Sequence, residues 1–456
     1  MSQTLSLFAQ HALLPQGWVD NVRLHWNEAG DLTQIETGVE VQAYEKQECY
    51  VVPGMTNLHS HAFQRAMAGM TEIAGEGPDS FWTWRDLMYR FALAITPEQI
   101  QAIAAQLYSE CLRYGYTSVC EFHYLHRAPD GQFYQQRAEM AARVIAAAEH
   151  CGMGISMLPV LYSFADFKDQ ALRDDQRRFR TNVDDILGLI GDLEALRSAQ
   201  VEVGVAPHSL RAANPQQIQE VVKALPKDRP IHIHIAEQMR EVEASLAATG
   251  QRPVELLLNT QDVDARWCLV HATHLTSEEV RGIAQSGAVA GICTTTEGNL
   301  GDGFFELPEF IEAGGVFGIG SDSHVSQSAV EEVRWLEYGQ RLRLQKRNVA
   351  SVAGRRRVAD FLWQECLKGG AQASGRRVGQ LSPSYRADFV VLDADHPNLH
   401  GLNNDQVLSS FVFSGNDNLV RDVYVGGSMR VQNQRHLHQE QIQNDFRACM
   451  QALRRL

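Results

Sequence analysis

The middle of the chain alternates short apolar runs with longer segments that have the periodicity of amphipathic helices. Eight apolar runs recur in this way, and each has the length of a buried strand. They are residues 55–61, 117–123, 155–163, 201–209, 230–237, 267–274, 288–296 and 316–324. Strands that alternate with helices form parallel sheets, so eight such units predict a (β/α)8 barrel.

Two of the intervening helices have ends that can be located from the sequence. The segment Thr-Pro-Glu-Gln at 96–99 offers an N-cap, a proline at the first helical position and a capping-box partner, and Gly115 marks the end of that helix. Thr276 and Glu279 repeat the capping box before a helix that ends near Gly287. Both helices lie between predicted strands, as a barrel requires.

The two ends of the chain have a different pattern, with β-like runs separated by turn-rich segments. These runs are residues 21–26, 32–38, 387–395 and 419–432, and residues 439–456 have helical periodicity. We predict that residues 1–53 and 378–456 together form a small β-sandwich with a C-terminal helix, beside a barrel of residues 54–377. The expected fold class is therefore α/β, a TIM-like barrel with a composite second unit.

Composition and charge narrow the classes of partner. The chain has 456 residues, of which 44% are hydrophobic and 21% charged, and its formal net charge is −14. An acidic chain repels nucleic acid and anionic membranes, so neither is an expected partner. No apolar run approaches the ~18 residues of a membrane span, and the opening segment lacks the basic and apolar regions of a signal peptide.

The eight cysteines are scattered and form no Cys-x-x-Cys pair. In a long chain without an export signal, reduced and mostly buried thiols are expected rather than a disulfide framework. The expected compartment is the cytoplasm.

Chemically active side chains stand at the ends of four predicted strands. His59 and His61 are two residues apart, so both side chains point to the same face of an extended segment. The other strand ends carry His234 with Glu237, His271, and Asp322. Barrel enzymes build their active sites at the C-terminal ends of the strands. Imidazoles and a carboxylate gathered there indicate a site for zinc or another first-row divalent ion.

The chain has two other His-x-His pairs, of which only His234 joins this group. His232 shares the inward face with His234 but precedes it, so we expect it to pack deeper in the barrel. His436 and His438 lie in a polar segment outside the predicted barrel, and we interpret that pair as coincidental.

Five motifs carry a resemblance to a known family: VVPGMTNLHSHAFQ, HIHIAE, HATH, GIGSDSH and GQLSPSYRADFVVLD. Over nearly the whole chain they resemble the amidohydrolase superfamily, in its deaminase and chlorohydrolase branch. Members with two metals commonly bridge them through a carboxylated lysine on the fourth strand, and residues 201–209 contain no lysine. The resemblance therefore implies one divalent metal ion per chain, expected to be zinc. Its ligands would be His59, His61, His234 and Asp322.

Four further segments, HAFQRAMAG, FWTWRDLMYR, EFHYLH and APHSLRAA, resemble a narrower family in that branch, the iminohydrolases of N-formimino-L-glutamate. This resemblance implies hydrolysis of the formimino group to N-formyl-L-glutamate and ammonia, a step of histidine degradation. Glu237 would carry a proton to the departing nitrogen, Asp322 would accept one from the attacking water, and His271 would stabilise the tetrahedral intermediate. Relatives are often homodimers, so a homodimer is expected.

The positions of two arginines favour a small anionic substrate. Arg85, in a predicted long loop after the first strand, and Arg211, three residues past His208, are cations placed near a charged metal site. This placement suits a substrate with carboxylates, which arginine binds through two parallel hydrogen bonds. The resemblance adds Gln64, Tyr124 and His208 as substrate contacts. In the structural alternatives, Arg85 pairs with a local carboxylate, Arg211 caps a turn, and Tyr124 only packs at the rim.

Other functions stay open at this stage. A deaminase of a cyclic base or nucleoside, such as guanine or an adenosine derivative, would use the same metal site without needing the arginines. A non-catalytic relative that keeps the fold as an assembly scaffold would lose metal ligands, and none is missing here. Cleavage of the same substrate to formamide by a two-manganese ureohydrolase requires an Asp-Ala-His-x-Asp motif, which the sequence lacks.

Overall fold

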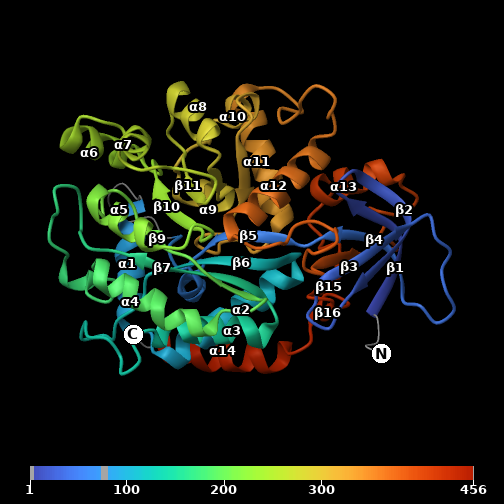
Figure 1. Ribbon diagram of the computed structural model, residues 1–456, viewed down its shortest axis with the longest axis horizontal. Coiled ribbons are helices and arrows are strands. Elements are labelled where there is room, and N and C mark those ends of the chain that lie inside the picture. The colour runs from blue at the N-terminus through green and yellow to red at the C-terminus, as the bar shows by residue number, and fades with distance from the viewer. Residues whose placement is uncertain (1–4, 73–80, 455–456) are drawn as a thin grey trace.

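The computed structural model describes residues 5–72 and 81–454 and places a barrel beside a sheet built from both chain ends (Figure 1). Each of the eight predicted apolar runs contains a barrel strand. The strands are β5 (Met55–Ser60), β6 (Tyr116–His123), β7 (Gly154–Leu161), β8 (Val201–Val203) with β9 (Ala206–Pro207), β10 (Ile231–Ile235), β11 (Trp267–His271), β12 (Val289–Ile292) and β13 (Val316–Ile319).

The barrel strands are parallel and pair in chain order. Strands β5 to β8 form one ladder and β10 to β13 form another. Isolated parallel bridges join the two ladders, from Val205 to Ile231 at one seam and from Ser60 to Asp322 at the other. The predicted TIM-like barrel is thereby confirmed. Its second seam also places Asp322 directly beside the strand that carries His59 and His61.

Seven of the eight apolar runs extend beyond the strands that they contain, and two of these runs show why. The run 201–209 is divided into β8 and β9 at Gly204, where an added Cβ would lie 2.3 Å from the carbonyl oxygen of Pro230. The run 288–296 stops being a strand at Ile292, because helix α9 (Thr294–Leu300) begins two residues later.

The helices around the barrel include both that the sequence located. Thr96 and Thr276 each accept a hydrogen bond from the third helical residue, and Gly287 ends the second helix in the left-handed conformation. The barrel helices are α1 (Phe81–Ala94), α2 (Pro97–Arg113), α3 (Glu139–Cys151), α4 (Val183–Leu193), α5 (Pro215–Ala224), α6 (Met239–Thr249), α7 (Pro253–Thr260), α8 (Ser277–Ser286), α9, α10 (Leu307–Glu312), α11 (Ala329–Leu344) and α12 (Val358–Ser374), with 3-10 turns η1 (Ala62–Met67), η2 (Asp174–Gln176) and η3 (Glu194–Leu196).

The prediction of a loop at FWTWRDLMYR is wrong, because this segment forms helix α1. Residues four apart on a helix lie on the same face. Helix formation therefore places Arg85 and Tyr89 side by side, and the guanidinium of Arg85 lies 5.6 Å from the centre of the Tyr89 ring.

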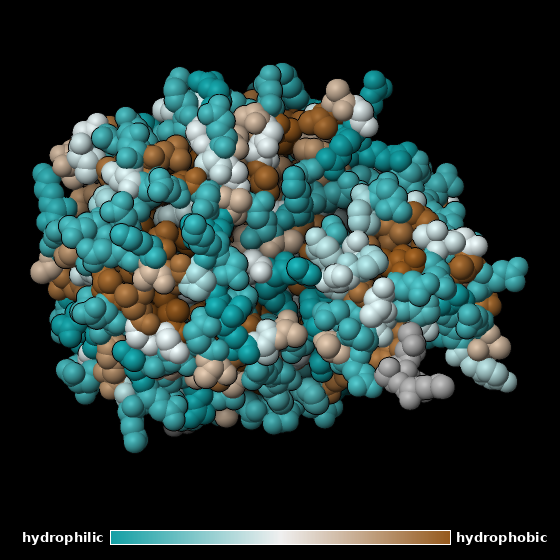
Figure 2. All heavy atoms as spheres, in the orientation of Figure 1, coloured by the Kyte–Doolittle hydropathy of each residue, from teal (hydrophilic) through white to brown (hydrophobic). Residues whose placement is uncertain are grey.

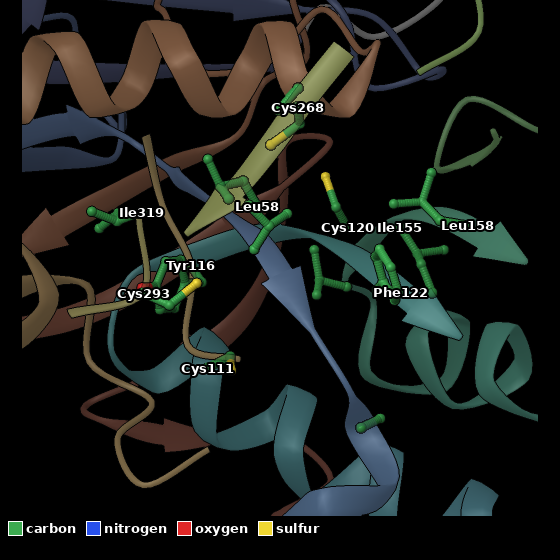
Figure 3. Packing of buried hydrophobic residues seen from close by; sticks show 14 of the residues in the cluster. Leu58, Cys111, Tyr116, Cys120, Phe122, Ile155, Leu158, Cys268, Cys293 and Ile319 are labelled. Carbon is green, nitrogen blue, oxygen red and sulfur yellow. The ribbon is translucent and has the colours of Figure 1, made fainter. Parts of the chain in front are cut away.

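Leu58 of β5 lies in the core of the barrel, near Tyr116, Cys120 and Phe122 of β6 (Figure 3). An added Cβ at Gly291 or Gly318 would come within 2.8 or 2.6 Å of its methyl carbons, so these glycines of β12 and β13 make room for it. Tight packing of this kind fixes the strands, and so the side chains at their ends, in one arrangement.

Strands from both chain ends form one sheet, in the order β17–β16–β15–β14–β4–β1–β2–β3. They are β1 (Leu5–Leu14), β2 (Gly17–Trp26), β3 (Leu32–Thr37), β4 (Gln47–Pro53), β14 (Phe389–Leu392), β15 (Val420–Val425), β16 (Ser428–Gln432) and β17 (Arg435–His436). Val51 of β4 lies opposite Val391 of β14, which joins the two ends. A second hydrophobic core, which includes Trp26 and Phe389, lies on this sheet. The two chain ends therefore meet as predicted, and their described strands form one continuous hydrogen-bonded sheet rather than two separate sheets.

We propose domain boundaries near residues 53 and 378, between this sheet and the barrel. Two helices that follow β14 lie outside the sheet: α13 (Asn404–Phe413) and α14 (Gln439–Leu453). Helix α14 runs along the barrel against α2 (Figure 1). There the guanidinium of Arg65 lies 5.6 Å from the centre of the Phe446 ring. The last helix thus covers the barrel, although in sequence it follows the sheet.

The surface of the face in Figure 2 is mostly polar, with apolar groups interspersed. Within residues 5–72 and 81–454, no helix combines the length and apolar character that a membrane crossing needs.

All eight cysteines are free thiols and seven are buried, as predicted. His436 is buried rather than exposed, because its Nε2 lies 3.0 Å from the carbonyl oxygen of Cys151 at the end of α3.

Candidate active site

Four side chains converge at the C-terminal end of the barrel, and we call them the metal-binding cluster: His59, His61, His234 and Asp322. The Nε2 atom of His59 lies 3.1 Å from Nε2 of His61 and 3.0 Å from Nε2 of His234. Oδ1 of Asp322 lies 3.3 Å from Nε2 of His61 and 3.5 Å from Nε2 of His59. All four residues are buried.

Two of these histidines are held in a defined orientation by backbone carbonyls. Nδ1 of His61 donates to the carbonyl oxygen of Phe122 at 2.8 Å, and Nδ1 of His234 donates to that of His208 at 3.1 Å. A neutral ring that donates from Nδ1 presents a lone pair at Nε2. Burial keeps the rings neutral, because it lowers the pKa of His59 to about 3 and holds the pKa values of His61 and His234 below their ordinary range.

The cluster fits a divalent metal ion. Burial would raise the pKa of Asp322, but the hydrogen bond with His59 and the positive charge of His271 hold it below its ordinary value, so the carboxylate is ionised. Ligand atoms at about 2 Å from a tetrahedral ion lie about 3.3 Å apart. The four distances of 3.0 to 3.5 Å given above, all of which involve His59 or His61, agree with this spacing. Converging lone pairs repel one another, and a bound cation removes that repulsion.

The backbone is strained where the strands deliver these side chains. Ala236, His271, Ala272 and Asp322 have positive φ angles of 51°, 70°, 48° and 46°. Residues with a Cβ rarely adopt this region, and each instance costs on the order of 1–3 kcal/mol. Strand pairing helps to hold the strained segment, since the N–H of Ala272 donates to the carbonyl oxygen of Ile235 at 3.0 Å.

Glu237 and His271 form an acid–base pair beside the cluster. Oε1 of Glu237 lies 3.7 Å from Nε2 of His271, whose Nδ1 lies 3.4 Å from Oε1 of Glu297. Burial raises the pKa of Glu237 to about 7. Burial would lower the pKa of His271, but Glu237, Glu297 and Asp322 raise it to about 10. At neutral pH His271 is therefore a cation, and Glu237 can both give and accept a proton.

The predicted substrate contacts line the same pocket as the cluster and the acid–base pair. These are Gln64, Arg85, Tyr124, His208 and Arg211. Nε2 of Gln64 donates to the hydroxyl of Tyr124 at 2.7 Å, and Tyr124 is buried in the pocket rather than placed at an exposed rim. Burial lowers the pKa of Arg85, and the nearby charge of Arg211 acts in the same direction. Two cations thus share one end of the pocket.

Several pocket residues were not singled out from the sequence. Tyr89 and Tyr162 line the substrate side, and Glu241 on α6 accepts a hydrogen bond from the N–H of Glu237 at 3.1 Å. Asp302 lies close to Glu237 and His271, and burial raises its pKa to about 10. Tyr162 directly follows β7, the third barrel strand, just as other site residues directly follow their own strands. Its position in the sequence could therefore have indicated a place in the site. Asp302 follows α9, and nothing in its local sequence marked it.

The model of the amidohydrolase family matches residues 50–430. The chain belongs to the amidohydrolase family. A second model, described as the N-terminal domain of formimidoylglutamate deiminase HutF, matches residues 4–48. This second match covers the N-terminal strands β1 to β3 and the start of β4.

Similar amidohydrolases are known at high and low identity. A formimidoylglutamate deiminase of Pseudomonas aeruginosa is 49% identical over 97% of this chain and 98% of its own length. A solved structure of an amidohydrolase from Brucella melitensis has a TM-score of 0.93 at 44% identity and covers 98% of this chain and 99% of that one. An adenosine deaminase structure from Xanthomonas campestris with bound zinc has a TM-score of 0.80 at 20% identity, over 99% and 98% of the two chains, and shares the fold.

Proposed function

We propose that this amidohydrolase is a formimidoylglutamate deiminase, which hydrolyses N-formimino-L-glutamate to N-formyl-L-glutamate and ammonia in histidine degradation. The observation that carries the proposal is the pairing of two arginines, Arg85 and Arg211, with a metal-binding cluster in one pocket. The 49% identity to the Pseudomonas aeruginosa enzyme over nearly the full chain supports it.

The metal-binding cluster would hold one divalent ion, which we expect to be zinc. When bound, the ion supplies a Lewis acid and lowers the pKa of a water molecule toward ~7. The single-ion assignment is supported by the fourth barrel strand, since residues 201–209 contain no lysine that could bridge a second ion.

Protein groups in and beside the cluster transfer protons and stabilise charge. Asp322, ionised in the protein, accepts a proton from the attacking water. Glu237, whose pKa is about 7, delivers a proton to the amidine nitrogen and so makes it a leaving group. Both protons of the attacking water finally reach the leaving nitrogen: Asp322 takes the first, and Glu237, once it has given up its own proton, takes the second as the carbonyl forms. His271 is a cation held by Glu237 and Glu297, and its charge stabilises the added oxygen as that second proton leaves.

The substrate side binds the rest of the molecule. The charges of Arg85 and Arg211 repel each other, and the carboxylates of Glu241 and Asp166 act on Arg211 but do not prevent the fall in the pKa of Arg85. A substrate with two carboxylates removes that repulsion and gains charge-assisted hydrogen bonds. Gln64, Tyr124 and His208 complete this wall. A cyclic base such as guanine offers no carboxylate, which disfavours a ring deaminase.

The test is ammonia release by the purified, metal-loaded protein from four compounds: N-formimino-L-glutamate, N-formimino-L-aspartate, guanine and adenosine. We expect efficient turnover of the first alone. Turnover of guanine or adenosine with none of the formimino acid would overturn the proposal and favour a ring deaminase. We further propose a homodimer, which light scattering of the same sample would test: a monomer mass would contradict it.

A further inference from the structure

A hydrogen-bonded group on the substrate side of the pocket joins Gln176 to two tyrosines. Nε2 of Gln176 donates to the hydroxyl oxygen of Tyr89 at 3.1 Å and to that of Tyr162 at 3.0 Å. Both tyrosines line the pocket, whereas Gln176 lies behind them and is 1% exposed. We call Tyr89 and Tyr162 the phenol pair, and the side-chain amide of Gln176 is the group that binds both of them.

The orientation of the amide is fixed by the backbone. Oε1 of Gln176 accepts the N–H of Arg173 at 2.9 Å, so the NH2 group must face the two phenols. An amide NH2 carries two protons and no lone pair for a hydrogen bond, and here each proton serves one phenol. Each hydroxyl oxygen is thus already an acceptor, and neither hydroxyl can donate back to Gln176.

The two phenolic protons therefore have few possible hydrogen-bond acceptors. In the described part of the chain, the only acceptor that either hydroxyl has is the oxygen of the other phenol. If one tyrosine donates to the other, the second still has a proton to give. At least one O–H of the pair is available to an acceptor that enters the pocket. Burial holds the pKa of Tyr89 above its ordinary value, so this hydroxyl keeps its proton at neutral pH.

The segment that carries Gln176 is anchored to the helix that carries Tyr89. Arg178, fully buried, donates to the carbonyl oxygen of Ile95 just beyond α1 at 2.8 Å and to that of Arg127 at 2.6 Å. On the other side, the N–H of Tyr162 donates to Oγ1 of Thr181 at 2.8 Å. These bonds hold both phenols against the amide before any ligand binds, which lowers the entropic cost of binding.

Both cations of the pocket also act on the phenol pair, and the guanidinium of Arg85 lies 5.6 Å from the centre of the Tyr89 ring. Arg85 and Arg211 each interact electrostatically with both Tyr89 and Tyr162. A carboxylate has two oxygens and about four lone-pair sites, more than one guanidinium fork can fill. We propose that the phenol pair donates a hydrogen bond to a substrate carboxylate held by these arginines, and that Gln176 is a positioning residue that turns the phenolic protons into the pocket. This inference rests on the proposed function and deepens it.

The first test removes the hydroxyls. The double variant Tyr89→Phe/Tyr162→Phe, assayed as metal-loaded protein for ammonia release from N-formimino-L-glutamate, should raise KM about tenfold or more while kcat changes little. Tyr134→Phe is the matched control: its hydroxyl accepts from Arg178 at 3.2 Å and lies outside the pocket, so KM should be unchanged. An unchanged KM in the double variant, with wild-type turnover intact, would overturn the inference alone. No turnover by the wild type would instead overturn the proposed function.

The second test replaces the amide of Gln176 either by a hydrogen-bond acceptor or by an apolar group. Gln176→Glu keeps the length of the side chain but offers the phenols a carboxylate oxygen, which draws their protons out of the pocket. Gln176→Met removes both donors and leaves the phenolic protons free to rotate. We expect KM to rise much more in Gln176→Glu than in Gln176→Met. Both variants should melt below the wild type, because one buries a carboxylate and the other removes the acceptor of the Arg173 N–H, and each should still unfold in one cooperative transition. Equal KM in the two variants would overturn the positioning role.

The third test asks whether the bond is made to a carboxylate. N-formimino-L-glutamine lacks the side-chain carboxylate, and N-formimino-4-aminobutyrate lacks the α-carboxylate. The KM penalty of the double variant should disappear with one of these two substrates and persist with the other, which identifies the carboxylate involved. A penalty of the same size with both compounds would show a general packing effect and overturn the inference.

Discussion

The carbonyl oxygen of His208 accepts the Nδ1–H of His234 at 3.1 Å. His208 lines the substrate side of the pocket and His234 belongs to the metal-binding cluster. One hydrogen bond therefore sets the tautomer of a candidate metal ligand from the wall on which we propose that the substrate binds. Bonds of this kind typically change metal affinity by about 10- to 100-fold.

We predict that the purified protein binds close to one equivalent of metal per chain, and that His234→Ala loses most of it. Excess zinc should raise the melting temperature of metal-free wild type, since an ion at 100 times its Kd adds about 2.7 kcal/mol of stability. His438→Ala, an exposed histidine of the coincidental pair, should bind metal like the wild type. Elemental analysis checks the stoichiometry, and two tightly held equivalents would contradict the single-ion assignment.

Glu237→Gln should lower turnover about 100-fold or more while the metal content stays at the wild-type level. The substitution keeps the size of the side chain and removes the group that titrates near neutral pH. Glu243→Gln changes an exposed position on helix α6, which begins two residues after Glu237, and should keep wild-type turnover. Near-normal kcat in Glu237→Gln would move the proton-transfer role to another group, with His271 the next candidate.

Arg211→Met should lower kcat/KM for N-formimino-L-glutamate by about 30-fold to several thousand-fold. Removing one partner of a buried ionic contact costs about 2–5 kcal/mol, and each 1.4 kcal/mol is about tenfold. Most of the loss should appear in KM, because the contact acts alike on substrate and transition state. Arg137→Met, which breaks an exposed ion pair with Asp192, is the control.

Two helical glycines should respond to alanine in opposite ways. At Gly369 on α12 an added Cβ would lie 1.8 Å from the carbonyl oxygen of Phe317 on β13, so Gly369→Ala should destabilise the protein by about 1–3 kcal/mol or more. At Gly191 on α4 nothing lies within 4 Å, so Gly191→Ala should be neutral or stabilise by up to about 1 kcal/mol. The melting temperatures of the two variants test this prediction. Equal shifts would contradict the explanation from the space around each glycine.

The barrel could be predicted because its signals are local and repeated. Each parallel strand needs an apolar run, and each run here precedes a recognisable helix or turn. The spacing of His59 and His61 placed both on one face without any tertiary information. Their convergence with His234 and Asp322 followed from one rule, that parallel strands deliver their ends to the same rim. The roles of these residues stay predictions until the variants are measured.

Other parts of the site depend on contacts that leave no local pattern. Gln176 lies in a turn of the long connection between β7 and α4, and its importance comes from two tyrosines distant in sequence. Tyr89 was hidden because its segment was predicted as a loop rather than α1. Asp302 acquires its environment only when the chain after α9 brings it close to Glu237 and His271. Such residues are defined by packing, and periodicity carries no information about them.

The pairing of β4 with β14 has a consequence for the order of events during synthesis. β4 emerges from the ribosome early, but its neighbour β14 is made only after every barrel strand. Until then β4 keeps one edge without its native partner, and unpaired edges recruit other chains. A nascent chain halted after residue 377 could complete its barrel yet would carry an exposed edge strand. Premature termination is therefore expected to yield aggregation rather than a soluble, partly active fragment.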